Sequence, residues 1–473
     1  MNLPDPEGAA RLLDRLRDAS GGVWADLFVE RRCVLRVAAG DIAGGKAVEA
    51  WDSGAGIRVV KGSGRAIHAS STGPPGRAVI AAARNLVGLA GEGAGEAAPD
   101  AGGGTDAPGE EADREPLTPW LSRERDLLAG YAGSLQAALC RELSSSSCRT
   151  VIDAAASSQE ILHISTDSPL VRDTRTGAVV NLTCHGRGAV LRRSWAARTS
   201  EELERRWPPA VEVPRLGEAL RRMEEAAPAP CGEFPVVFGA GAGGLLVHEA
   251  VGHLLEGDVV LRGSSPFSPY LRPGSLEPDA LVPLSPLLTV IDSPSDLRGR
   301  GSYELDDEGT KVRRTVLVQR GRIIGHLGDR WNSPGTTGHG RRQSHREPPM
   351  PRLAATFCAP GEHDPAEIVR ETVRGVFVDE LRRGFLDPAS GDFVLHAAEG
   401  RLIEGGKLTA GLRDLVLLGS ALKSLSQVDR VGSDLAGDGG AHSCVRGGQA
   451  VATIVGMPTL RIASMNVAGM MVP

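Results

Sequence analysis

Two histidines five positions apart impose the strongest local constraint on how this chain folds. His248 and His253 enclose Glu249 in the segment 248–253, which reads His-Glu-Ala-Val-Gly-His. On a regular α-helix, residues i and i+5 point about 140° apart, because each residue advances the helix by about 100°. The two imidazoles converge only if the helix contains a π-type bulge, a feature that is frequent at functional sites. Gly252, just before the second histidine, is suited to such a distortion.

The residue types in this segment are those of a hydrolytic metal site. Two neutral imidazoles are good ligands for a borderline-soft divalent ion, above all zinc. Glu249, beside the first histidine, can accept a proton from an attacking water. The alternative is that both histidines only cap or line a helix. The preceding sequence favours a built site, because an apolar strand at 234–238 and a glycine-rich turn at 239–244 lead into the motif.

Length and composition restrict the class of protein. A chain of 473 residues predicts two or three domains. A net charge of −6 without a long basic run argues against direct nucleic-acid binding. No apolar run of about 18 residues occurs, and the acidic N-terminus is unlike a signal peptide, so we expect no membrane span or export signal. Seven scattered cysteines are not a disulfide framework, which predicts a cytoplasmic location.

The chain divides at a segment that cannot form a core. Residues 91–116 are almost entirely Gly, Ala, Pro, Glu and Asp, which predicts a disordered linker. Before it, residues 1–90 read as an N-terminal α+β subdomain, and after it residues 117–228 read as a central α+β subdomain. Residues 229–473 predict a larger, β-rich C-terminal domain that carries the metal-binding helix. The predicted fold class is therefore α+β, with helices on mixed sheets in the N-terminal region.

The C-terminal domain has many short apolar runs between glycine and proline turns, and these predict strands. Two further stretches, at 365–381 and 412–425, are interpreted as its other helices.

A catalytic zinc site generally has three protein ligands and one open position, so a third ligand is needed. Cys231, Cys358 and Cys444 are candidates in the C-terminal domain, together with other histidines and several carboxylates. Cys444 ends a glycine-rich loop, and a loop can bring a thiolate to a distant metal. The residues alone favour Cys444 only weakly, because a buried, unreactive cysteine is the common alternative.

Several motifs together resemble a known family. The block 248–258 reads HEAVGHLLEGD, an acidic turn DDEG occupies 306–309, and a basic segment TGHGRRQS occupies 337–344. Three further matching stretches, PMPR, DPASGDF and IEGGK, lie at 349–352, 387–393 and 403–407. Together they are similar to the TldD-like, catalytic subunit of the TldD/PmbA metalloprotease family, which also carries the name modulator of DNA gyrase.

The resemblance implies a zinc-dependent peptidase with one Zn²⁺ per catalytic subunit. His248, His253 and Cys444 would hold the ion, and Glu249 would be the general base. The implied substrates are unfolded peptides or small proteins, including precursors of peptide natural products. The implied partner is a metal-free TldE/PmbA-like subunit in a heterodimer, with a homodimer as the alternative. One departure concerns the substrate groove, since Ala355 stands where the family has asparagine.

Four further side chains are candidates for supporting roles. Arg341, Arg342 and Arg352 are predicted to bind a peptide carboxylate or a developing oxyanion. The alternative is a structural salt-bridge cluster with the acidic turn 306–308. Asp258 is predicted to orient a ligand histidine, or else it is a surface acid at a helix end.

Three other functions stay open on the sequence alone. The chain could be the non-catalytic, TldE/PmbA-like scaffold subunit, although the intact His248, Glu249, His253 and Cys444 argue against this. It could be a regulator that binds gyrase or its inhibitors without chemistry. It could also be a metal-dependent amide hydrolase that acts on a small metabolite. Metal content and activity on unstructured peptides distinguish these functions.

Overall fold

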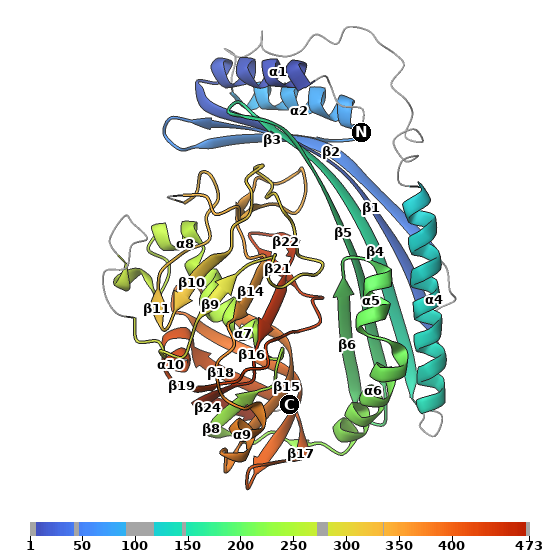
Figure 1. The fold of residues 1–473 in the computed structure, drawn as a ribbon. Coiled ribbons are helices and arrows are strands. Elements are labelled where there is room, and N and C mark those ends of the chain that lie inside the picture. The colour runs from blue at the N-terminus through green and yellow to red at the C-terminus, as the bar shows by residue number, and fades with distance from the viewer. Residues whose placement is uncertain are drawn as a thin grey trace.

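Long, curved strands form one side of the molecule, and a β-rich body packs against one face of them (Figure 1). This computed structural model describes residues 6–41, 47–90, 118–143, 148–271, 282–333 and 335–469. The predicted linker 91–116 lies outside these residues. No helix within the described ranges combines the length and the apolar character needed to cross a membrane. The predicted α+β class is confirmed.

The N-terminal sheet joins segments from both sides of residues 91–116. Its strands follow the order β3-β2-β1-β4-β5-β6, and every pairing is antiparallel. The strands are β1 (Gly22–Gly40), β2 (Ala47–Lys61), β3 (Ala66–Thr72), β4 (Arg149–Ser165), β5 (Ser168–His185) and β6 (Val190–Ala197). Because β1 pairs with β4, the two predicted N-terminal segments contribute three strands each to one sheet.

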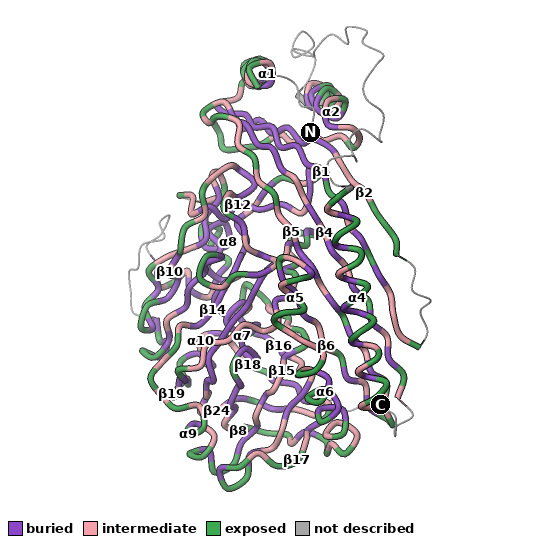
Figure 2. Tube along the Cα trace, turned by 45° about the vertical axis from the view of Figure 1, so that its right-hand side comes forward, coloured by how far each residue is buried: buried purple, intermediate pink, exposed green. Residues whose placement is uncertain are grey.

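The two faces of this sheet differ in character because side chains alternate along each strand. On β1, Leu27 and Val29 are buried in an apolar cluster with the helices, whereas Asp26 and Glu30 belong to the opposite face. The helices of this region are α1 (Pro6–Ala19), α2 (Pro75–Ala90), α4 (Thr118–Glu142), α5 (Ser200–Arg206) and α6 (Pro209–Glu224). Figure 2 shows the buried residues of the sheet beneath the helices.

The C-terminal part contains two larger sheets with both parallel and antiparallel pairs. One has eight strands: β7 (Ala227–Pro228), β8 (Gly232–Phe238), β15 (Arg374–Leu386), β16 (Asp392–Glu404), β17 (Lys407–Arg413), β18 (Leu415–Ser420), β19 (Val428–Val431) and β24 (Leu460–Gly469). The other has six: β9 (Val290–Asp292), β10 (Thr315–Gln319), β11 (Arg322–Ile323), β14 (Ala355–Cys358), β20 (Ala436–Gly437) and β23 (Ile454–Met457). Two separate two-stranded sheets complete the C-terminal part: β12 (Gly340–Arg341) with β13 (Met350–Pro351), and β21 (Ser443–Arg446) with β22 (Gln449–Ala452).

Both additional helices predicted in this domain are largely wrong. Of residues 365–381, only α9 (Pro365–Arg370) is helical, and residues 374–381 belong to β15. Of residues 412–425, the first two end β17, residues 415–420 form β18, and only the short helix α10 (Ala421–Ser426) is helical. In the first stretch the apolar positions Ile368, Val369, Val373, Val376 and Phe377 recur at helical spacing, so a short helix followed by a strand is easily mistaken for one longer helix.

The histidine motif lies on a helix that changes its winding, as its spacing predicts. An α-helical turn, α7 (Gly244–Val247), continues into a π-helical turn over His248–Gly252 and then a 3-10 turn over His253–Leu255. Helix α8 (Gly257–Leu261) follows. The predicted bulge is therefore confirmed, because the π turn adds the extra residue between the histidines.

Gly252 serves a different purpose from the one expected. Its φ of −58° and ψ of −60° are ordinary helical values that any residue adopts. A Cβ atom at this position would lie 2.0 Å from Cδ2 of Leu353. Glycine is therefore required by the close approach of Leu353, and not by the backbone distortion.

We predict that Gly252→Ala destabilises the protein by about 1–3 kcal/mol, because the added methyl group overpacks the contact with Leu353. Gly133→Ala is the matched control, since Gly133 lies on the exposed face of α4 with no atom near its missing Cβ. The control should be neutral or stabilising by up to about 1 kcal/mol. Urea unfolding measures both changes. An unchanged midpoint for Gly252→Ala would contradict the packing argument.

A buried ion cluster joins the polar face of the N-terminal sheet to the C-terminal part. Arg58 on β2 donates to Asp26 at 2.9 Å and to Glu308 at 2.8 Å, and all three side chains are buried. Burial alone raises the pKa of Asp26, but the charge of Arg58 and the contact with His163 outweigh it, so the net pKa lies below its usual range. The ionised carboxylate therefore stabilises the fold at neutral pH.

Replacing the cation tests this cluster. Arg58→Met should cost about 3–5 kcal/mol at pH 7, because it leaves two buried carboxylates without their partner. A carboxyl whose pKa is lowered in the folded state stabilises above its unfolded pKa of about 3.9 and loses this contribution as the pH falls below it. The deficit of the variant should therefore shrink below pH 4. Arg123→Met, which removes an exposed pair with Glu201, should cost less than about 1 kcal/mol.

Candidate metal centre

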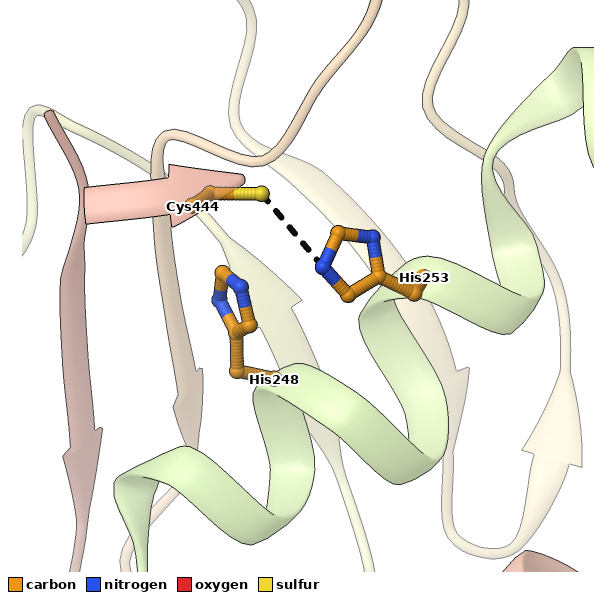
Figure 3. A group of neighbouring side chains, drawn as sticks. All are labelled: His248, His253 and Cys444. Carbon is orange, nitrogen blue, oxygen red and sulfur yellow. Dashed lines mark hydrogen bonds between the residues drawn. The ribbon is translucent and has the colours of Figure 1, made fainter. Parts of the chain in front are cut away.

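Three potential ligand side chains meet at the π turn. His248 and His253 project from successive turns of the same helical segment, and Cys444 faces them from β21 (Figure 3). Their ligand atoms all lie within 4.8 Å of one another. Sγ of Cys444 is 3.3 Å from Nε2 of His253, and the two imidazole rings are nearly perpendicular. The structure therefore brings together all three predicted ligands from positions far apart in the sequence.

The electrostatics of the cluster favour a thiolate. Burial raises the pKa of the Cys444 thiol, but His253 and His248 outweigh burial and hold the pKa well below its usual range. Burial likewise lowers the pKa of His253, yet Glu256 and Cys444 raise it well above its usual value. Together these shifts describe a thiolate beside a protonated imidazole. Zinc would bind the thiolate and release the proton of His253, because a zinc site requires neutral imidazoles.

The donor set fits a zinc ion. Zn–N and Zn–S bonds of about 2.0 and 2.3 Å separate tetrahedral ligands by about 3.5 Å, and the sulfur-to-nitrogen distance of 3.3 Å agrees with this. Nδ1 of His248 is buried and has no hydrogen-bond partner among the described residues. Two imidazoles and one thiolate leave one tetrahedral position for water or substrate.

A cavity of about 730 Å³ opens beside the three ligands, and Glu249 lines its wall with them. A Cβ atom at Gly384 would lie 3.1 Å from Cγ of Glu249, so the glycine on β15 leaves space for this side chain. The carboxylate that the sequence singled out as a base therefore shares one cavity with the ligand cluster.

The acid that contacts a ligand histidine is Glu256, not Asp258. Oε2 of Glu256 lies 3.1 Å from Nδ1 of His253, and the Glu256 side chain is fully buried. Asp258 accepts from Arg446 at 2.7 Å, and Arg446 also lies 3.1 Å from Glu256. Asp258 thus reaches the histidine only through Arg446 and Glu256. The sequence held a signal for Glu256, because a residue three positions after His253 lies on the same helix face.

The three arginines predicted to bind substrate lie away from the cavity beside the histidines. Arg341 donates to the carbonyl oxygens of Leu353 and Ala452, both at 2.9 Å, and Arg342 contacts the acidic turn through Asp307. All three arginines are buried, and none lines the cavity beside the histidines. Arg342 contacts the acidic turn through its own amide and through the main-chain carbonyl oxygen of Asp307, and its nearest carboxylate partner is Asp26 at 3.6 Å.

Arg352 supports the metal cluster indirectly. Its guanidinium is fully buried and donates to the carbonyl oxygen of Cys444 at 2.5 Å and to that of Gln449 at 3.3 Å. These bonds hold both strands of the β21–β22 hairpin, which carries the thiol. Ala355 is buried in β14, and its amide donates to Asp292. Both residues therefore shape the surroundings of the site and do not face the cavity.

Glu30, Asp52 and His345 form a second group of potential ligands, and their ligand atoms lie within 4.8 Å of one another. This group is already satisfied internally. Glu30 accepts from Nδ1 of His345 at 2.8 Å, and Asp52 pairs with Arg346 at 2.6 Å. Since these carboxylates are engaged by protein donors, we assign no metal to this group.

Sequence comparison identifies relatives of the C-terminal half. A family model described as the PmbA/TldA metallopeptidase C-terminal domain matches residues 231–469. The metalloprotease TldD homolog of Buchnera aphidicola (subsp. Schizaphis graminum) is 35% identical over 245 residues, which cover 51% of this chain and 49% of the relative. The TldD homolog of Haemophilus influenzae is 36% identical over 248 residues, covering 52% of this chain and 50% of the relative. The match thus spans about half the length of these curated relatives.

Solved structures share the whole fold at low sequence identity. TldE from Thermococcus kodakarensis has a TM-score of 0.71 at 18% identity, and the match covers 98% of this chain and 99% of that chain. A protein of Thermotoga maritima assigned as a modulator of a DNA gyrase has a TM-score of 0.69 at 18% identity, covering 97% and 99%. The family model places residues 231–469 among metallopeptidase C-terminal domains, and the solved structures show the same fold. The chain belongs to the PmbA/TldD family, which confirms the resemblance inferred from its motifs.

The contact between Glu256 and His253 yields a prediction. Glu256→Gln should weaken zinc affinity by about 10–100-fold, because carboxylates that orient ligand histidines contribute this much. Asp258→Asn is the matched control and should have a clearly smaller effect, since Asp258 acts one contact further away. Competition with a chromophoric chelator measures both affinities. Equal losses in the two variants would contradict the assignment of Glu256.

Proposed function

We propose that this chain is a zinc-dependent peptidase of the TldD type. The observation that carries the proposal is the shared cavity, which contains two imidazoles, one thiol and the Glu249 carboxylate. His248, His253 and Cys444 would hold one Zn²⁺. When bound, zinc lowers the pKa of water to about 7 and polarises a carbonyl oxygen.

The chain's own residues supply the remaining steps. The Glu249 carboxylate accepts a proton from the attacking water and later delivers it to the nitrogen of the leaving amine. Glu256 holds the His253 ring through Nδ1, which keeps Nε2 directed toward Cys444. Arg352 holds the carbonyl oxygen of Cys444 and fixes the position of its strand. The reaction is hydrolysis of a peptide bond by water.

The cavity supports an extended peptide as the substrate. Strand β21 pairs only with β22 in the described part of the chain, so its other edge carries backbone groups that no strand pairs. Ser443–Arg446 of this strand line the cavity. An unfolded segment can add to such an edge through main-chain hydrogen bonds and little sequence preference. Unfolded peptides, small proteins and precursors of peptide natural products all meet this description.

The alternatives are less well supported. A metal-free scaffold subunit would not need two histidines and a thiol converging beside a carboxylate, and the same cluster argues against a regulator without chemistry. A peptide is favoured over a small metabolite amide because the unpaired edge of β21 lines the cavity. We propose a TldE/PmbA-like subunit as the partner, with a homodimer as the alternative. All seven cysteines are free, which supports a cytoplasmic location.

The decisive variant separates metal binding from catalysis. Glu249→Gln should retain zinc but lose at least about 100-fold in the hydrolysis of unfolded casein, because it removes the proton acceptor. His248→Ala should lose zinc, because it removes one ligand. Zinc is measured by mass spectrometry of the purified protein, and hydrolysis is measured with and without the partner subunit.

Glu233→Gln serves as the control, since Glu233 is exposed on β8 and does not line the cavity. This variant should match the natural chain in both assays. More than a few per cent of the natural activity in Glu249→Gln would refute the base assignment. Equal zinc content in His248→Ala and the natural chain would show that the metal site lies elsewhere.

A further inference from the structure

A second, smaller cavity lies between the polar face of the N-terminal sheet and the β21–β22 hairpin. Its volume is about 100 Å³, and its walls include residues of β4, β5, β12 and β22. Figure 1 shows β22 on the side of the C-terminal body that faces these long strands. The cavity shares no lining residue with the one beside the histidines. It is therefore a separate site that the proposed hydrolysis does not use.

The lining of this cavity is strongly basic. Five arginines contribute to it and no aspartate or glutamate does; the arginines are Arg32, Arg175, Arg300, Arg341 and Arg342. Within the described segments of the chain, Arg175 alone among these five has close carboxylate partners, Asp173 at 3.0 Å and Asp307 at 2.6 Å. Arg342 lies 3.6 Å from Asp26, which Arg58 already engages. The positive charge around the cavity thus exceeds what the neighbouring acids neutralise.

Several guanidinium donors at the cavity are unused. Nε of Arg300, Nε of Arg341, and both Nε and Nη1 of Arg342 are buried with no hydrogen-bond partner among the described residues. Arg341 and Arg342 are only 5% and 4% exposed. Burial, together with the charges of Arg32 and Arg341, lowers the pKa of Arg300 to about 10. Buried charged donors without acceptors are costly, so their retention points to an absent acceptor.

The same arginines hold the strand that carries the thiol. Nη2 of Arg300 donates to the carbonyl oxygen of His442 at 3.0 Å and to Oγ of Ser443 at 2.7 Å. Arg341 donates to the carbonyl oxygen of Ala452 on β22. A group bound among these guanidinium groups would therefore fix both ends of the hairpin that contains Cys444.

We propose that this cavity binds a small, multiply charged oxyanion of the phosphate type, and that the bound anion orders the Cys444 hairpin. A tetrahedral anion with about two negative charges offers four acceptor oxygens to several guanidinium groups at once. A single carboxylate offers fewer acceptors and only one charge. The inference goes beyond the proposed peptidase function, and its test does not depend on hydrolysis.

Binding of inorganic phosphate tests the proposal by isothermal calorimetry on the purified full-length chain. We expect saturable binding of phosphate and of sulfate, and at least tenfold weaker binding of acetate at equal ionic strength. Phosphoserine distinguishes the source of the phosphate group: weak binding indicates free phosphate, and equal binding indicates the phosphate of a larger molecule. Binding should persist in His248→Ala, which excludes the metal centre as the site.

Arg300→Gln should weaken phosphate binding at least tenfold. Arg32→Glu is the second variant, because Arg32 is exposed and its replacement does not disturb the core. Arg322→Gln, an exposed arginine on β11 outside the cavity, is the matched control and should bind like the natural chain. Hydrogen exchange at residues 442–452 should slow when phosphate binds. The proposal is overturned if phosphate binds no better than chloride. It is also overturned if Arg300→Gln and Arg32→Glu bind phosphate as well as the control Arg322→Gln does.

Discussion

The Arg58 guanidinium, buried between Asp26 and Glu308, is the contact on which the rest of the arrangement depends. It fixes the acidic turn of the C-terminal part against the N-terminal sheet. Asp306 of that turn then accepts from the amide of Gly340, which positions the basic segment. That segment leads to Arg352, which holds the carbonyl oxygen of Cys444. Because buried polar groups must all be satisfied together, this chain of contacts defines one relative position of the two parts.

The π turn has a comparable role within the metal centre. One extra residue per turn brings His253 onto the face of His248, and without it the two rings would diverge. This geometry follows from the spacing alone, so the motif was the most predictable part of the site. Cys444 was not predictable in this way, because 191 positions separate it from His253. The glycine-rich loop before Cys444 favours that thiol only weakly, and the resemblance to a family supplies the rest of the prediction.

Other features depend on contacts that no local pattern records. The pairing of β1 with β4 joins segments on either side of residues 91–116, and the intervening composition predicts only a break. Strand β15 lies between β8 and β16, and neither pairing can be inferred from its own sequence, whose first residues continue the helical spacing of the preceding segment. The residue type predicts that Arg341 and Arg352 bind a carboxylate or an oxyanion, whereas both are buried and hold main-chain carbonyls, a contact that no local pattern records.

The β21–β22 hairpin stands between two sites of opposite chemical character. One side presents the Cys444 thiol to the histidines, and the other is held by arginines with unused donors. A ligand that orders the hairpin from the arginine side reduces the entropy lost when Cys444 is fixed at the metal. Thermodynamic linkage is reciprocal. If a bound oxyanion raises the affinity for the metal by some factor, a bound metal must raise the affinity for the oxyanion by the same factor. Placing the thiol on a hairpin, and not on the rigid helix that carries both histidines, is what makes such coupling physically available.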